Sequence, residues 1–194
     1  MTPPNRPRQP GRPDARPPAG PPAPPREGMG RVHAVQPRHL HFLMRDGTAI
    51  EGVVQVGENQ SLISFLNSRS GWMSVTKAKR SRSDEAPGHM IIHANHIVMA
   101  NSPDGAVQLA NTGAASGVER LVEVVLVGGR VVRGYISGAL GQRLSECIAA
   151  SGKYVAVSLA RLFPEGTDVG DVALQTNALE IVRDLRITDS EAAE

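Results

Sequence analysis

The histidines are the residues of this sequence whose spacing best suits a metal ion. Five of the six fall in two clusters, His39 with His41 and His89 with His93 and His96. A metal needs convergent ligands, and His39 and His41 share one face of an expected strand, as do His89 and His93. The second half of the chain does not repeat these histidines. We therefore expect partly exposed histidines that hold no metal, and we expect no cofactor.

Three short patterns have a formal similarity to catalytic motifs. Ser74 and Lys77 fit the Ser-x-x-Lys spacing of acyl enzymes, but that chemistry needs a helix, and an alternating strand points the two side chains to opposite faces. Gly152-Lys153 lacks the first glycine and the Ser or Thr of a phosphate-binding loop. Cys147 lies on the apolar stripe of an expected helix, which is typical of a core position. The chain is therefore not expected to be an enzyme, and a small-molecule ligand is not expected either.

A cluster of cations offers a contact for nucleic acid or another partner. Four lie within six residues, namely Lys77, Lys79, Arg80 and Arg82. Such cations can follow a phosphate backbone, and Trp72 on the same expected strand can supply a stacking face. Alternatively the segment is a solvated loop between strands, which the neighbouring serines and acidic residues favour.

The N-terminal segment differs in composition from the rest of the chain. It holds 12 of the 15 prolines and six arginines, with few apolar side chains to offset the entropy of ordering. We predict a disordered Pro/Arg-rich arm over residues 1–37. It is either a solvated leader or a segment that binds an aromatic groove or an anionic partner. The chain has one cysteine and no run of 18 apolar residues, so we expect a cytoplasmic protein without a membrane span.

The rest of the chain contains an internal repeat at an offset of 82 residues. Residues 40–100 align without a gap on residues 122–182, and Gly52 falls on Gly134. In each copy an Asp-Gly or Gly-Gly turn joins two alternating strands, and a short helix and two more strands follow. The shared glycine predicts a bend or close packing in the second strand.

This pattern predicts a mainly β fold with short helices, built from tandem β-β-α-β-β repeats. The repeats cover residues 38–101 and 120–186, with a linker over 102–119 and an acidic tail over 187–194. They would form two small SH3- or Sm-like half-barrels, or pack as one pseudo-twofold domain. In the second repeat the place of the basic segment is taken by Leu159, Leu162 and Phe163. That apolar set would cover the other repeat or meet a partner.

Two resemblances add to this reading. Residues 61–67 (SLISFLN), 72–76 (WMSVT) and 93–97 (HANHI) resemble an uncharacterised bacterial family of short β-rich domains, and residues 143–148 (RLSECI) resemble it again. Residues 42–54 (FLMRDGTAIEGVV) are similar to the first motif of Sm-like proteins, which implies a bent barrel that forms rings and binds RNA. The Sm helix precedes the first strand, whereas here it follows the second, so no RNA-binding residue is carried over.

The sequence therefore predicts a cytoplasmic bacterial protein that is not an enzyme and that binds or assembles with a protein, either itself or another. The alternative is an Sm-like RNA-binding protein that uses the basic arm and the loop from Lys77 to Arg82.

Overall fold

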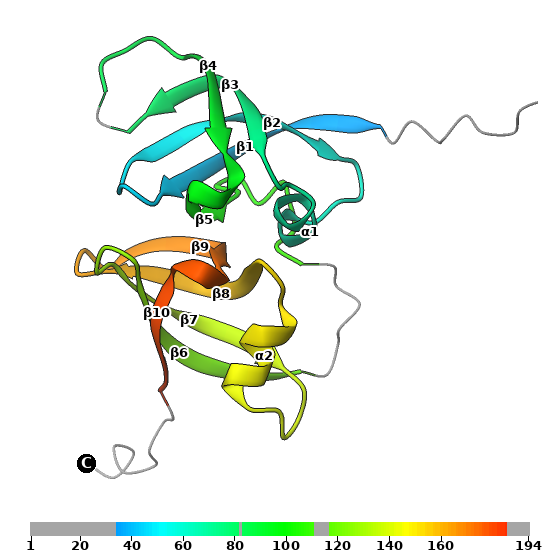
Figure 1. The fold of residues 1–194 in the computed structure, drawn as a ribbon, viewed down its shortest axis with the longest axis vertical. Helices are drawn as coiled ribbons and strands as arrows, with labels where there is room; N and C mark the ends of the chain where they lie inside the picture. The colour runs from blue at the N-terminus through cyan, green and yellow to red at the C-terminus, as the bar shows by residue number, and fades with distance from the viewer. Residues whose placement is uncertain (1–33, 82, 111–116, 186–194) are drawn as a thin grey trace, which may run out of the picture. The chain divides into compact units, whose positions relative to one another are not determined.

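The computed structural model describes residues 34–81, 83–110 and 117–185. Over these residues the chain is mainly β, with two short α-helices and two single-turn 3₁₀ helices (Figure 1), so the predicted fold class is confirmed. The strands are β1 (Val35–Met44), β2 (Ala49–Gly57), β3 (Trp72–Arg80), β4 (Gly88–His93), β5 (Ile97–Asn101), β6 (Val118–Leu126), β7 (Val131–Gly138), β8 (Tyr154–Phe163), β9 (Thr167–Gln175) and β10 (Leu179–Asp184). The helices are α1 (Leu62–Asn67), η1 (Ala94–His96), α2 (Leu144–Ala150) and η2 (Thr176–Ala178).

The same order of elements occurs twice along the chain. β1 to β5 form the first half with α1 and η1, and β6 to β10 form the second half with α2 and η2. The two 3₁₀ helices, residues 94–96 and 176–178, are 82 residues apart, as are Gly52 and Gly134. We call two residues equivalent when 82 positions separate them.

The first hairpin forms at the predicted Asp46-Gly47 turn. Gly47 has a φ of 84°, a region that glycine enters without a steric penalty. The Thr48 amide donates to Asp46 Oδ1 at 2.9 Å, which closes the turn. In the second half Gly128 and Gly129 take φ values of 88° and 79° at the equivalent turn.

The glycine shared by β2 and β7 allows close packing against the next strand, as predicted. A Cβ atom on Gly52 would lie 2.5 Å from Cγ1 of Val75, and one on Gly134 would lie 2.6 Å from Cγ1 of Val157. The register of each strand with its neighbour shifts next to its glycine. The missing side chain therefore lets the following strand cross closely at this point.

Helix α1 begins at the predicted cap and packs its apolar face into the core. Ser61 Oγ accepts from the Ser64 amide at 3.2 Å, the usual N-cap contact. The residues spaced i, i+3, i+4 in this helix are at most 1% exposed, namely Leu62, Phe65 and Leu66. In α2 the predicted core position Cys147 is also buried.

All ten strands belong to one antiparallel sheet in the order β10-β6-β7-β8-β9-β5-β1-β2-β3-β4. The two halves join where β5 pairs with β9, through Met99 opposite Leu174 and Ala100 opposite Ala173. An interface with a pseudo-twofold axis would pair equivalent strands, such as β5 with β10 or β4 with β9. The junction instead joins two non-equivalent edges, one from each half.

Two predicted boundaries also need correction. Residues 35–37, assigned to the arm, are the first residues of β1, because they pair with β2. Part of the predicted linker belongs to the core of the first half, because Val107 and Leu109 are 7% and 9% exposed and pack in its buried cluster. The Leu62 and Ile63 amides donate to the carbonyls of residues 108 and 109, which holds this segment beside α1.

The remainder of the arm (residues 1–33), the middle of the linker (111–116) and the tail (186–194) lie outside the described residues. Among the described residues, no helix has the length and apolar character needed to cross a membrane.

Candidate functional site

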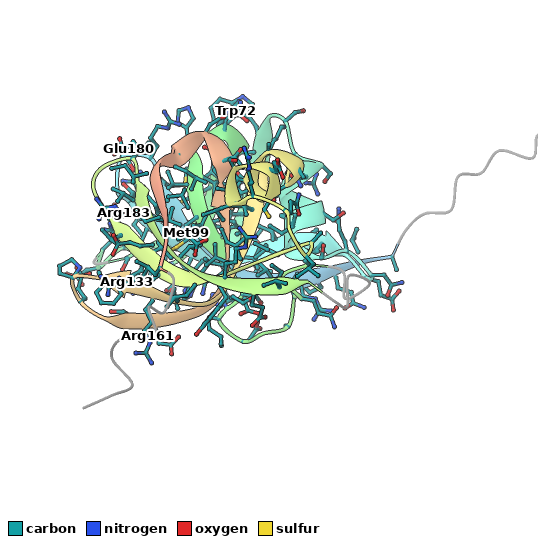
Figure 2. All side chains as sticks on the ribbon, turned by 90° about the horizontal axis from the view of Figure 1, so that it is seen from below. Trp72, Met99, Arg133, Arg161, Glu180 and Arg183 are labelled. Carbon is teal, nitrogen blue, oxygen red and sulfur yellow. The ribbon has the colours of Figure 1, made fainter. Side chains whose placement is uncertain are left out.

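The outer face of the β3–β4 hairpin carries large exposed apolar side chains. Trp72 is 74% exposed and Ile91 is 61% exposed. Trp72 lies opposite His93 in the ladder, and the two rings meet edge to face at 5.0 Å. Figure 2 shows Trp72 at the periphery, whereas Met99, on the β5 side of the junction, lies among the strands. Because β4 is the last strand of the sheet, this face adjoins a free strand edge.

The equivalent face of the second half is covered. Tyr154, equivalent to Trp72, is 1% exposed, and Ala173, equivalent to Ile91, is fully buried. The Tyr154 hydroxyl donates to the carbonyls of Ala94 and Ile97 in the first half, at 2.9 and 3.3 Å. Burial raises the pKa of Tyr154 to about 12. The first half therefore covers the outer face of β8–β9, whereas the equivalent face of β3–β4 is exposed.

The predicted basic segment is strand for most of its length, not a loop. Lys77, Lys79 and Arg80 lie in β3, while Arg82 is outside the described residues. At about 3.3 Å per residue, the three cations lie roughly 16–26 Å along the strand from Trp72. The structure therefore does not bring Trp72 together with them, and Lys79 instead pairs across the ladder with Glu51.

A β-bulge interrupts β3 at Lys77. This residue has a φ of 49°, and the β3–β4 register shifts between Val75 and Ala78. Alternation therefore fails at Lys77, and both Ser74 and Lys77 are exposed. The partner of Ser74 is His89, with 2.7 Å between Oγ and Nε2.

The apolar residues of β8 do not form one exposed surface. Leu159 is 68% exposed, at a bulge where its φ is 51°. Leu162 packs against the core of the second half. Phe163 is half-buried, and the guanidinium of Arg133 lies over its ring at 4.6 Å. Of the three, only Leu159 has a largely exposed side chain.

A second cluster lies on β1 and β2, where His39 and His41 share one face and Glu51 stands opposite His41. His41 Nε2 is 3.6 Å from a Glu51 carboxylate oxygen. The two imidazole rings meet edge to face at 5.3 Å between their centres. Burial and the neighbouring His39 lower the pKa of His41.

His89, His93 and His96 are not part of this cluster. β2 and β3 separate β1 from β4, so the two histidine pairs are not adjacent in the sheet. His93 instead lies near His96, with ring centres 5.5 Å apart. Glu51 was not among the candidates predicted from the sequence, although the Asp46-Gly47 turn fixes a register that places residue 51 opposite residue 41.

A groove of about 1400 Å³ extends across the junction of the halves. The first half lines it with His41, Asn101 and Ser102, and the second half adds Asp168 and Asp171. Asn101 stabilises its wall by donating from Nδ2 to the carbonyl of Val169 at 3.1 Å. The groove therefore exists only because the two halves are joined.

No protein-family model, no curated protein and no solved structure matches the chain.

Proposed function

We propose that this chain is a non-enzymatic assembly protein that joins to further copies of itself through the two ends of its sheet. One observation carries the proposal: Trp72 and Ile91 are exposed on β3–β4, while their equivalents Tyr154 and Ala173 are buried by the first half of the chain. The chain thus contains one complete junction, and each end of its sheet carries one of the two surfaces that a second junction would need.

The junction between the two halves of the chain is the model for the proposed contact between copies. Backbone pairing joins β5 to β9. Tyr154 donates to two carbonyls around η1, and Gln175 Nε2 donates to the Asn95 carbonyl at 3.1 Å. Helix α1 packs against β8, so Leu62 and Leu66 are 1% and 0% exposed.

The end at β10 has the features that β5 would have without a partner. Every residue of β5 is buried, whereas the β10 residues are all partly or fully exposed, and Ile181 is 46% exposed. Leu144 and Ile148 of α2 are only half-buried, although they are equivalent to Leu62 and Leu66. These apolar side chains are the ones that a second β3–β4 face would cover.

The end at β4 has matching donors. If β10 of one copy pairs with β4 of the next in the register of the β5–β9 junction, Ile181 lies opposite Ile92 and Val182 opposite Ile91. The Trp72 indole N–H then takes the place of the Tyr154 hydroxyl and faces the carbonyls of residues 176 and 179. A ring N–H of His93 takes the place of the Gln175 amide and faces the carbonyl of residue 177.

Such an interface is head-to-tail, so it produces a closed ring or an open filament. Exposed strand edges with apolar side chains are suited to this kind of addition. The proposal therefore commits to a second copy of the same chain as the partner.

The test uses variants that block one end each. We expect the full chain to form species larger than a monomer in sedimentation velocity as its concentration rises. Trp72→Arg blocks the β4 end and Ile181→Lys blocks the β10 end, so each variant alone should be a monomer. An equimolar mixture should give a one-to-one dimer, because one intact end of each kind remains.

Leu159→Lys is the matched control, because it adds the same charge at an exposed apolar position of β8 and lysine already occupies the equivalent position 77. This variant should assemble like the unmodified chain. A chain that stays monomeric up to millimolar concentration would overturn the proposal. If that monomer retained RNA at low salt and released it at high salt, the nucleic-acid alternative would be favoured instead.

A further inference from the structure

His39, His41 and Glu51 form the closest group of metal-ligating side chains in the described part of the chain. Their ligand atoms all lie within 4.8 Å of one another, and no other three His, Cys, Asp or Glu side chains among the described residues meet this criterion. Two of the ligands are imidazoles and the third is a carboxylate. This donor set suits zinc and neighbouring divalent transition metals better than calcium or magnesium.

We propose that His39, His41 and Glu51 bind one divalent transition-metal ion, with Zn²⁺ as the best match. The backbone fixes the arrangement, because residues two apart on β1 share a face and Glu51 is directly opposite His41 on β2. The three ligands therefore project from adjacent ladder positions of one hairpin. A site of this kind needs no large change in the backbone to form.

The distances are close to those of a coordinated ion. Zinc–nitrogen and zinc–oxygen bonds of about 2.0–2.1 Å in a tetrahedron place the ligand atoms about 3.3 Å apart. His41 Nε2 and the Glu51 oxygen are already 3.6 Å apart. The imidazole of His39 can close the remaining gap by rotation of its side chain, since the ring stands edge to face with that of His41.

Three protein ligands leave one position open for water or another ligand. Of the three ligands, His41 also lines the groove at the junction of the halves, so the site borders that groove. Asp104 lies near enough to act electrostatically on both histidines, and its carboxylate accepts from Ser102 and Ala106. It adds negative charge beside the site, which favours a bound cation.

In the second half, the positions equivalent to His41 and Glu51 form an ordinary ion pair. Glu123 and Arg133 replace His41 and Glu51, and the Arg133 guanidinium lies 2.8 Å from the Glu123 carboxylate. Leu121 replaces His39. The second half thus places a cation at the position of a proposed ligand, whereas in the first half the cation Lys79 stands on β3, opposite Glu51.

The experiment measures metal binding to the full chain by isothermal titration with Zn²⁺, and by the visible absorption of Co²⁺ in place of zinc. We expect one site per chain. His39→Ala, His41→Ala and Glu51→Gln should each weaken the affinity at least tenfold and abolish the tetrahedral Co²⁺ bands. Zn²⁺ should raise the melting temperature of the unmodified chain but not of Glu51→Gln.

The control variant is His96→Ala, because His93 and His96 form the other close histidine pair and could bind metal adventitiously. It should retain the full affinity and the Co²⁺ spectrum. The proposal is overturned if the unmodified chain binds no metal, or if His96→Ala loses as much affinity as His41→Ala. These ligands lie on the partly exposed surface of one hairpin, so circular dichroism should show all four variants folded.

Discussion

Trp72 and Tyr154 occupy the first positions of equivalent strands, yet Trp72 is 74% exposed and Tyr154 is 1% exposed. The difference arises from the head-to-tail junction, which places the first half over β8, whereas no other part of the described chain covers Trp72 on β3. Equivalent residues should therefore respond differently to the same kind of substitution, and this difference can be measured in a single chain.

Removing the Tyr154 hydroxyl should destabilise the fold. Tyr154→Phe leaves the Ala94 and Ile97 carbonyls without this donor in a buried position, which should lower the free energy of unfolding by about 1–2 kcal/mol. Trp72→Phe, at the exposed equivalent position, should change it by less than about 0.5 kcal/mol. Urea unfolding of the two variants measures both values, under conditions where the chain is a monomer. Equal effects at the two positions would contradict the described burial.

Stability should fall at alkaline pH because of the same hydroxyl. The pKa of Tyr154 is about 12 in the folded chain, against about 10 for an ordinary tyrosine in the unfolded chain. The folded state disfavours the phenolate, so this contribution is fully present below pH 10 and is lost as the pH rises towards 12. Tyr154→Phe should remove this part of the pH dependence, roughly 2 kcal/mol across the window. Urea midpoints at several pH values would show the difference, and parallel curves for the two proteins would refute it.

The glycines of β2 and β7 should not tolerate a methyl group. Gly52→Ala places Cβ 2.5 Å from Val75, and Gly134→Ala places it 2.6 Å from Val157 and 2.8 Å from the Ser158 carbonyl. Each should cost about 1–3 kcal/mol of stability through overpacking, and Gly134→Ala should cost more because backbone yields less readily than a side chain. Gly88→Ala is the control, since nothing lies within 4 Å of its added methyl group. A loss at Gly88 as large as at Gly52 would contradict the packing argument.

Local patterns in the sequence predicted much of the fold. Alternation, the Asp46-Gly47 turn and the i, i+3, i+4 spacing in α1 depend on residues close together in the chain, and each matches the structure. The pairing of β5 with β9 could not be predicted in this way, because it depends on which edges of two similar halves meet. Trp72 and Tyr154 are both aromatic residues at strand starts, so residue type does not distinguish the open position from the buried one.

In the candidate sites, too, the features set by local sequence were predictable and the others were not. The cross-strand contact of His41 with Glu51 depends only on the hairpin register, so the sequence contained enough information to predict it. The bulge at Lys77 was not predictable from residue type, because lysine has no preference for a positive φ. The expected basic loop is strand for most of its length because β3 continues past the bulge to Arg80.

The bulge at Leu159 provides a test of backbone strain. Leu159 has a φ of 51° and its side chain is 68% exposed, so the side chain contributes little packing while the backbone occupies a region disfavoured for non-glycine residues. Leu159→Gly should relieve this strain and keep the hydrogen bond that the backbone N–H of residue 159 donates to Asp171 Oδ1 at 3.1 Å. Leu159→Ala removes the same side chain without relieving the strain. We expect the glycine variant to be more stable than the alanine variant by about 0.5–1 kcal/mol in urea unfolding, even though glycine loses more entropy on folding. An alanine variant as stable as the glycine variant would mean that the left-handed conformation at this bulge costs no more than the extra entropy that glycine loses on folding.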